Sequence, residues 1–331
     1  MRDQAFVLGY ADNTHLQGFQ GKDIVQLGEY HMTAPFGAVT DCNSPDFNGI
    51  DGIVGFGMPA PQGPPPPPAG GAGGMMGMMG QAGGGFGSMN HAPPSLPLPL
   101  LFSLTDTKNA GAGDKVLTRR AFSFVSTDTK GEIHLGGYDP AAISGDMFMT
   151  PCISTHDYSV VAMSLKYGEK ELIQFKGSVT KGAQYVPAIM DSGTSCLVMP
   201  DSDLNGKLAF SPFSTWKKEV GDVDAPSSHE SFFINIAGRE FEIPYHIWYL
   251  SDTNQSCVQP APPGFPGLLV GDVFFRRYLV LFDLERYPQE VVIGIGLHNP
   301  SYELLGYYGE SKVIPKIPAD RRAARILLWA R

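Results

Sequence analysis

The sequence predicts an all-β protein, because its apolar residues fall mostly in short alternating runs separated by Gly, Asn, Asp or Pro. The clearest run covers residues 232–243, where two alternating arms flank Ala237-Gly238-Arg239 in the pattern of a β-hairpin. Helical patterns are few, with short ones at 204–210 and 273–278 and a basic amphipathic one at 319–330. Further strands are expected at residues 22–27, 122–125, 132–135, 158–165, 278–283 and 291–295.

Length and charge restrict the class of protein further. A chain of 331 residues can form two lobes or one large domain. Its 24 basic and 33 acidic residues give a net charge of -9, which disfavours binding to nucleic acid or to an anionic membrane surface. No apolar run reaches the roughly 18 residues of a membrane span, and the N-terminal residues lead into no secretory h-region.

The four cysteines, Cys42, Cys152, Cys196 and Cys257, do not have the spacing of a metal site, so we expect no bound metal. Their even number permits up to two disulfides, but separation along the sequence does not say which sulfur atoms can meet. The triplet Asn254-Gln255-Ser256 is a sequon for N-glycosylation and hints at the secretory pathway.

Residues 59–99 differ in composition from the rest of the chain. Of these 41 residues, 22 are Gly or Pro and none is charged. The proline run at 64–68 favours polyproline II, and the glycine-rich part at 70–87 lacks the side chains that a core needs. We interpret the segment as a disordered insertion within a folded lobe.

One short motif carries candidate catalytic chemistry. The apolar residues 186–190 predict a strand that ends at Asp191 and is followed by Ser192, Gly193 and Thr194. Gly193 allows a tight turn that brings backbone N–H groups near the Asp191 carboxylate, and the two hydroxyls can donate hydrogen bonds to it. Such a loop would hold Asp191 ionised and oriented. Asp-Ser-Gly is also a common turn sequence, so the surroundings decide its interpretation.

Two further segments give the motif a context. Leu269-Val270-Gly271 ends 80 residues after Asp191, and residues 122–140 include the sequence Gly136-Gly137-Tyr138-Asp139-Pro140. Together with the Asp191 loop they resemble the pepsin-like aspartic proteases, in which a hydrophobic-hydrophobic-Gly arm threads an Asp-Thr/Ser-Gly-Thr/Ser loop. The resemblance implies an all-β, bilobal acid-protease fold with two pseudo-symmetric lobes around a cleft.

The N-terminal half resembles the first lobe of that family in part. Asp51 to Gly57 resembles its arm, and residues 18–28 resemble the flap hairpin and the strand after it. Tyr10 would then be the flap tyrosine that closes over substrate, but an ordinary strand tyrosine fits the sequence equally well. The expected parts are a partial N-terminal lobe at 1–137 that contains the insertion 59–99, a C-terminal lobe at 138–297 with the Asp loop, and a tail at 298–331.

The chain departs from the family because Asp-Thr/Ser-Gly occurs once, at Asp191. Members of the family use two carboxylates that share one proton. Counting back from Gly55 by the separation between Asp191 and Gly271 places the missing Asp about 25 residues before Met1. We therefore interpret the sequence as lacking the start of the N-terminal lobe, because it is incomplete. The alternatives are a non-catalytic peptide-binding homologue and a homodimer that supplies two copies of Asp191.

The resemblance implies an aspartic endopeptidase that hydrolyses peptide bonds in proteins by general acid/base activation of water, without metal or cofactor. Asp191 would be a catalytic carboxylate supported by Ser192, Gly193 and Thr194. With one such carboxylate, this chain is expected to be inactive alone. A monomer that acts on protein or peptide substrates in a secreted, vacuolar or lysosomal location completes the expectation.

The family also bears on two of the cysteines. Cys257 occupies a position that in the family is often one half of a disulfide, but no cysteine lies between Cys196 and Cys257 to serve as the usual partner. We expect Cys196 to be a small buried apolar residue rather than a nucleophile.

Overall fold

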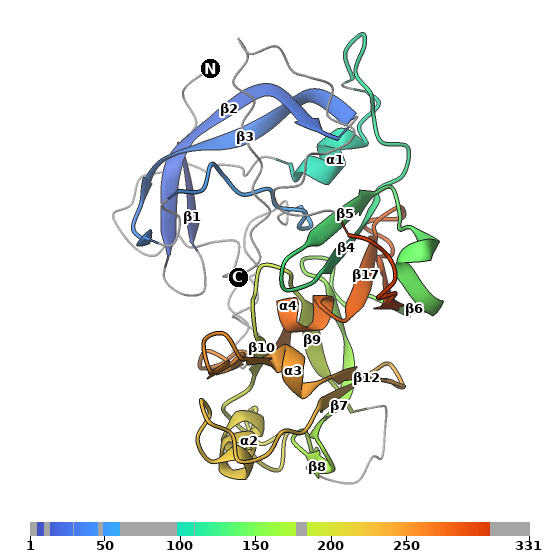
Figure 1. Cartoon of the computed structure of the whole chain (residues 1–331). Coiled ribbons are helices and arrows are strands. Elements are labelled where there is room, and N and C mark those ends of the chain that lie inside the picture. The colour runs from blue at the N-terminus through green and yellow to red at the C-terminus, as the bar shows by residue number, and fades with distance from the viewer. Residues whose placement is uncertain are drawn as a thin grey trace. The chain divides into compact units, whose positions relative to one another are not determined.

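The computed structural model describes residues 5–9, 14–28, 30–45, 49–59, 98–108, 110–176 and 184–304. The chain forms two compact units; the described part of the first lies within Met1–Arg120 and that of the second within Ala121–Gly309. Tyr10, nearly all of the insertion predicted at 59–99 and the helix predicted at 319–330 lie outside the described residues. Figure 1 labels the elements of each unit.

The first unit contains three antiparallel strands in the order β1-β2-β3. These are β1 (Ala5–Gly9), β2 (His15–Leu27) and β3 (Tyr30–Cys42). They bury Phe6, Leu16 and Met32, and the short helix α1 (Leu100–Leu104) packs against β3. The strand predicted at 22–27 is confirmed as the second half of β2.

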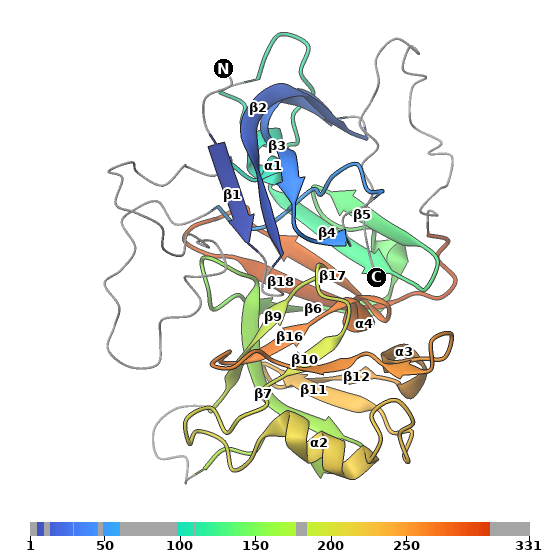
Figure 2. The same ribbon diagram turned by 90° about the vertical axis from the view of Figure 1, so that its left-hand side faces the viewer.

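One sheet of the second unit has five antiparallel strands in the order β5-β4-β17-β18-β6 (Figure 2). They are β4 (Ala121–Ser126), β5 (Gly131–Leu135), β6 (Ile143–Pro151), β17 (Tyr278–Asp283) and β18 (Val292–His298). The strands predicted near 122–125, 132–135, 278–283 and 291–295 are therefore present. Ala121 pairs with Asp283, and the second compact unit begins at residue 121.

The other sheet has eight strands, with the path β12-β11-β7-β9-β16-β10-β15 and β8 beside β7. They are β7 (Ser159–Tyr167), β8 (Lys170–Glu171), β9 (Val186–Met190), β10 (Leu197–Met199), β11 (Phe232–Ile236), β12 (Arg239–Ile243), β15 (Val258–Pro260) and β16 (Leu268–Val270). The hairpin predicted at 232–243 is confirmed as β11 and β12. Its turn residues Ala237 and Gly238 have φ angles of 48° and 92°, as a two-residue hairpin turn requires. A separate two-stranded piece pairs β13 (Tyr249–Leu250) with β14 (Gln255–Ser256).

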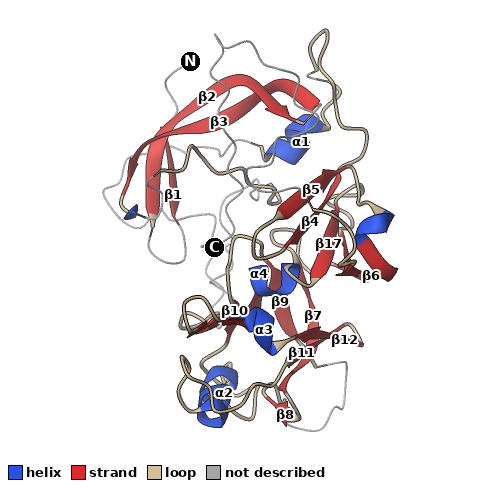
Figure 3. Ribbon diagram, in the orientation of Figure 1, coloured by secondary structure: helices blue, strands red, loops and turns tan. Residues whose placement is uncertain are grey.

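Helices are short in the described part of the chain, as the blue ribbons of Figure 3 show. The longest, α2 (Pro212–Val220), was not predicted. Its start has two local signals: the Ser211 side chain accepts a hydrogen bond from the Ser214 N–H, and proline occupies the first turn. The others are the 3-10 turn η2 (Pro140–Ala142), α3 (Tyr245–Trp248) and α4 (Asp272–Phe275). None of these helices is long and apolar enough to cross a membrane.

The structure corrects the two short helices predicted from the sequence. The helix expected at 204–210 is absent, because Leu204, Asn205 and Gly206 have φ angles of 51°, 58° and 83° and the chain turns there. The helix expected at 273–278 is confirmed only in part as α4, since the chain enters strand β17 at Tyr278.

An aromatic cluster lies in the core of the second unit. Trp216, Trp248, Tyr167 and Phe232 contact one another with ring centroids 5.0 to 6.5 Å apart. The Trp248 indole N–H donates to the backbone oxygen of Glu230 at 3.0 Å, which satisfies a buried polar group. Because Tyr167 and Phe232 belong to β7 and β11, the cluster anchors the sheet that also carries β9.

Candidate active site

The candidate site forms where β9 ends and its neighbour β16 turns away. β16 runs parallel to β9, with Val270 opposite Met190, and antiparallel to β10, with Leu197 opposite Val270. The Asp191 N–H donates to the Val270 backbone oxygen at 3.0 Å. The predicted Asp loop and the predicted apolar arm therefore lie side by side, and β16 lies between β9 and β10, the two strands that this loop joins (Figure 2).

Gly271 allows the arm to pass through this loop. The N–H of Asp272 donates to the Thr194 backbone oxygen at 2.7 Å, and that of Val273 donates to the Ser195 oxygen at 3.2 Å. A Cβ atom at position 271 would lie 2.4 Å from the backbone oxygens of Thr194 and Cys196. Only glycine fits so close an approach between two backbones.

The Asp191 carboxylate is oriented by its own loop. The Gly193 N–H donates to Oδ1 at 2.9 Å and the Thr194 hydroxyl donates to Oδ2 at 2.7 Å, so each oxygen accepts one hydrogen bond. Asp191 itself is half-buried, which leaves its carboxylate within reach of water. Of the three supporting residues expected from the sequence, Gly193 and Thr194 contact the carboxylate; no hydrogen bond from the Ser192 hydroxyl reaches it within the described residues.

A buried ion pair holds the segment that follows the arm. Asp272, 1% exposed, accepts hydrogen bonds from Arg276 Nε at 2.7 Å and from the Ser126 hydroxyl at 2.5 Å. Arg276 also pairs with Asp128 at 2.6 Å. A buried carboxylate needs such partners, because burial without them is costly. The sequence does not reveal Ser126 as a partner of Asp272, since residues 126 and 272 meet only in the fold.

The structure corrects the expectation for Cys196. It forms a disulfide with Cys257, with a Cα–Cα distance of 4.6 Å, rather than serving as a free apolar residue. The reason lies in the sheet: β10 and β15 are parallel neighbours with Leu197 opposite Val258, so the residues just before them also face each other. The bridge ties the loop that follows Asp191 to β15. Cys42 and Cys152 are free, and burial raises the pKa of Cys152 to about 11.

The segment that resembles the N-terminal arm, Asp51 to Gly57, does not form a paired strand as the arm before Gly271 does. Residues 51–59 contain no strand, and Ile53 is 54% exposed. A Cβ atom at Gly55 would meet nothing within 4 Å. Tyr10, the expected flap tyrosine, lies outside the described residues, so its role stays a prediction.

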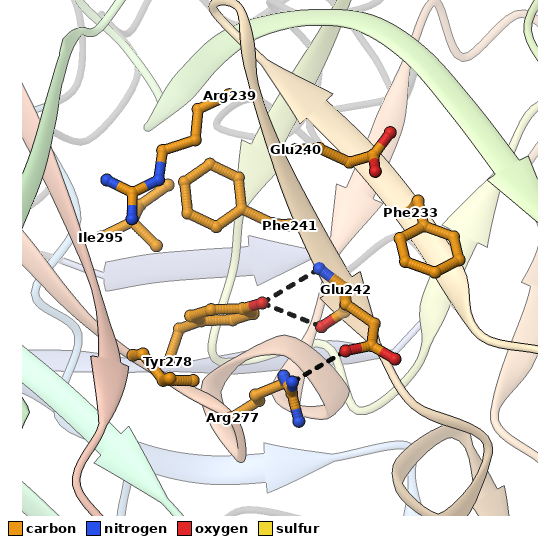
Figure 4. Close-up of a pocket in the computed structure, with 9 residues that line it drawn as sticks. Phe233, Arg239, Glu240, Phe241, Glu242, Arg277, Tyr278 and Ile295 are labelled. Carbon is orange, nitrogen blue, oxygen red and sulfur yellow. Dashed lines mark hydrogen bonds and ion pairs between the residues drawn. The ribbon is translucent and has the colours of Figure 1, made fainter. Parts of the chain in front are cut away.

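A pocket of about 230 Å³ lies elsewhere in the second unit, around the start of β17 (Figure 4). There Glu242 pairs with Arg277 at 2.8 Å, while its backbone N–H donates to the Tyr278 hydroxyl and its backbone oxygen accepts from the same hydroxyl, both at 3.0 Å. These contacts fasten β12 to β17. The pocket contains no residue of the Asp191 loop. Its lining consists of Phe233, Arg239, Glu240, Phe241, Glu242, Arg277, Tyr278, Ile295 and Leu297.

Comparison with known proteins gives consistent matches. A profile of eukaryotic aspartyl proteases matches residues 109–292. The chain is 23% identical over 298 residues to barrierpepsin from Saccharomyces cerevisiae, covering 85% of this chain and 45% of that protein. It is 28% identical over 187 residues to gastricsin from Oryctolagus cuniculus, covering 52% of this chain and 45% of that protein. The chain thus spans about half the length of these curated relatives.

A solved structure shows the same fold. The aspartic proteinase from Irpex lacteus superposes with a TM-score of 0.60 at 16% identity, covering 90% of this chain and 82% of that one. The predicted mostly-β fold of pepsin-like type is confirmed by this match.

Proposed function

Because the chain belongs to the eukaryotic aspartyl protease family, we propose that Asp191 is one of the two catalytic carboxylates of an aspartic endopeptidase that acts on proteins. One observation carries the proposal: the half-buried carboxylate at the end of β9 accepts one hydrogen bond on each oxygen from Gly193 and Thr194. This arrangement presents the carboxylate in a defined orientation, as general acid/base chemistry requires.

The chemistry needs a second carboxylate. In a proton-sharing pair, one member is ionised and activates a water molecule, while the protonated member donates a hydrogen bond to the carbonyl oxygen of the peptide bond. Asp191 supplies one member, and the sequence contains no second Asp-Thr/Ser-Gly motif. Asp191 alone cannot share a proton in this way, so the 331-residue chain by itself is inactive on peptides. Neither metal nor cofactor takes part in the proposed reaction.

A single Asp-Thr/Ser-Gly motif also fits a second candidate function, that of a non-catalytic peptide-binding homologue. Both candidates fit a secreted, vacuolar or lysosomal monomer with a protein or peptide partner. The Cys196–Cys257 bridge supports such a location, because disulfides persist in oxidising compartments.

The test compares the 331-residue chain with an extended form in which a segment carrying a second Asp-Thr/Ser-Gly loop precedes Met1. We expect the extended form to cleave an acid-denatured protein at acidic pH and the shorter chain to leave it intact. Asp191→Asn should abolish cleavage by the extended form, while Asp252→Asn, a change at an exposed turn, should preserve it.

Two results would contradict the proposal. Cleavage by the 331-residue chain that is lost in Asp191→Asn would show that no second Asp-Thr/Ser-Gly loop is needed. An extended form that binds a peptide substrate without cleaving it would favour the binding homologue.

A change at Thr194 tests the orientation of the carboxylate. Thr194→Val removes the hydroxyl that donates to Asp191 Oδ2, and we expect kcat/KM of the extended form to fall about 10- to 100-fold, the effect of losing a hydrogen bond to a charged group. Thr194→Ser retains the donor and should keep most of the activity. Equal kcat/KM values for Thr194→Val and Thr194→Ser would show that the Thr194 hydroxyl does not contribute to orienting Asp191.

A further inference from the structure

The sequon Asn254-Gln255-Ser256 begins at the last residue of the turn that joins β13 to β14, and its other two residues form β14. Asn254 is exposed, and its φ of 52° lies in the left-handed region that asparagine tolerates. Within the described residues its side chain makes no hydrogen bond. A group attached to the Asn254 amide would therefore project from a turn without displacing any contact of the fold.

A second Asn-x-Ser triplet of the same unit, Asn299-Pro300-Ser301, serves as a comparison. The Asn299 amide nitrogen donates to the Ala141 backbone oxygen at 3.0 Å, and its amide oxygen accepts from the Ser301 N–H at 3.0 Å. Proline in the middle of the triplet also excludes it as a glycosylation acceptor. Of these two Asn-x-Ser triplets, only the one at 254 combines a permitted sequence with a free amide.

An independent observation indicates the compartment. Cys257 directly follows Ser256 and is bonded to Cys196 in the folded protein. Disulfides of this kind form in oxidising compartments such as the lumen of the endoplasmic reticulum. In eukaryotes this lumen is also where asparagine side chains receive oligosaccharides. The disulfide and the sequon are adjacent in the sequence, and both indicate the lumen of the endoplasmic reticulum.

We propose that Asn254 carries an N-linked glycan. In the transfer, Nδ2 of Asn254 forms a bond with the anomeric carbon of an oligosaccharide held on a lipid pyrophosphate. The bond from that carbon to the pyrophosphate oxygen breaks, the lipid pyrophosphate leaves, and the amide loses one proton. The attached glycan is bulky and hydrophilic, which suits an exposed turn.

The folded structure also indicates that glycan transfer comes before folding of this region. The Ser256 hydroxyl, which a sequon must present to the transferase, donates to the Val223 backbone oxygen, and Ser256 is paired with Tyr249 in the two-stranded piece. The N–H of Cys257 donates to the Trp248 backbone oxygen at 2.7 Å, which holds the next residue in place. The hydroxyl is therefore occupied once this region has folded. Transfer to Asn254 therefore precedes folding of this region.

The first experiment translates the full 331-residue chain, behind a cleavable secretion leader, in the presence of rough microsomes. We expect one glycan, seen as a single endoglycosidase-sensitive step in gel mobility. Asn254→Gln should remove the step, and Asn299→Gln should leave it unchanged. Failure of the wild-type chain to be modified, in microsomes that modify a standard glycoprotein, would overturn the proposal, as would a step that persists in Asn254→Gln.

The second experiment tests the order with purified oligosaccharyltransferase and a lipid-linked donor. The oxidised, folded chain should be a poor acceptor at Asn254, and the reduced and denatured chain should be modified at least tenfold faster. Cys257→Ser should shift the native preparation toward the faster rate. Equal rates for the folded and reduced chains would show that the Ser256 hydroxyl is not withheld by folding. Neither readout depends on proteolytic activity, so failure of the proposed function would leave both results interpretable.

Discussion

Two segments of this chain share the pattern of two apolar residues followed by glycine, and the structure treats them in opposite ways. Leu269-Val270-Gly271 ends β16, which is paired with β9 on one side and β10 on the other. Ile53-Val54-Gly55 belongs to no strand among the described residues. Leu269 is 8% exposed, whereas Ile53 is 54% exposed.

The difference shows what a local pattern does and does not specify. An apolar pair followed by glycine can thread a loop, but the threading requires a strand on each side to supply hydrogen-bond partners and apolar neighbours. In the second unit β9 and β10 supply both, and the loop between them positions Asp191. The pattern at 53–55 has the same local character without those partners in the described part of the first unit.

The largest predicted effect is a difference in stability between alanine variants at Gly271 and Gly55, the glycines that end the two apolar segments. Gly271→Ala places a Cβ atom 2.4 Å from two backbone oxygens that cannot move without opening the Asp191 loop, and we expect a loss of about 4 kcal/mol in the free energy of unfolding. Gly55→Ala meets open space and should change it by less than about 0.5 kcal/mol. Urea denaturation followed by far-ultraviolet circular dichroism measures both. A comparable loss at Gly55 would mean that the first arm is also threaded.

The next effect concerns the apolar residue two positions before each glycine. Leu269 packs in a buried cluster with Ile189, Val198 and Ala261, so Leu269→Ala should cost about 3 kcal/mol through lost contacts and a residual cavity. Ile53→Ala should cost less than about 1 kcal/mol, because more than half of that side chain is already exposed. Hydrogen exchange read by mass spectrometry would check the contrast in the wild-type chain. Slow exchange across residues 53–55 would argue against an unpaired first arm.

The smallest predicted effect is a dependence of the free energy of unfolding on pH, because the second unit contains a histidine whose pKa is lowered in the folded protein. Burial lowers the pKa of His298 below its usual value, an effect that Glu132 partly offsets, and the Nε2 atom lacks a hydrogen-bond partner within the described residues. The unfolded chain therefore binds a proton at higher pH than the folded chain does. The free energy of unfolding should fall as pH drops below about 6.5.

Variants at two histidines isolate this contribution. His298→Asn should weaken the pH dependence between pH 7.5 and 5.5, as measured by urea denaturation at each pH. His246→Asn, a change at an exposed histidine of the same unit, should leave it as in the wild-type chain. An unchanged pH dependence in His298→Asn would rule out His298 as its source.

Strands were easier to predict from this sequence than helices, for a physical reason. Alternation along residues 232–243 reports which face of each strand is buried, and the structure has the hairpin at those residues. α2 buries Pro212, Trp216 and Val220, so its apolar stripe is too sparse to recognise. The segment at 204–210 has apolar residues at helical spacing, but three consecutive left-handed residues prevent a helix there.

What the sequence determined by itself was local: the alternation of the strands, the glycine-turned loop after Asp191, and a set of motifs specific enough to predict the family. The tertiary structure decided which distant residues meet. It joined Cys196 to Cys257, placed Ser126 against Asp272, and ran β16 parallel to β9. Such contacts depend on closing loops of tens of residues or more, and the free energy that closes them comes from burial in the completed sheets rather than from the residues at either end.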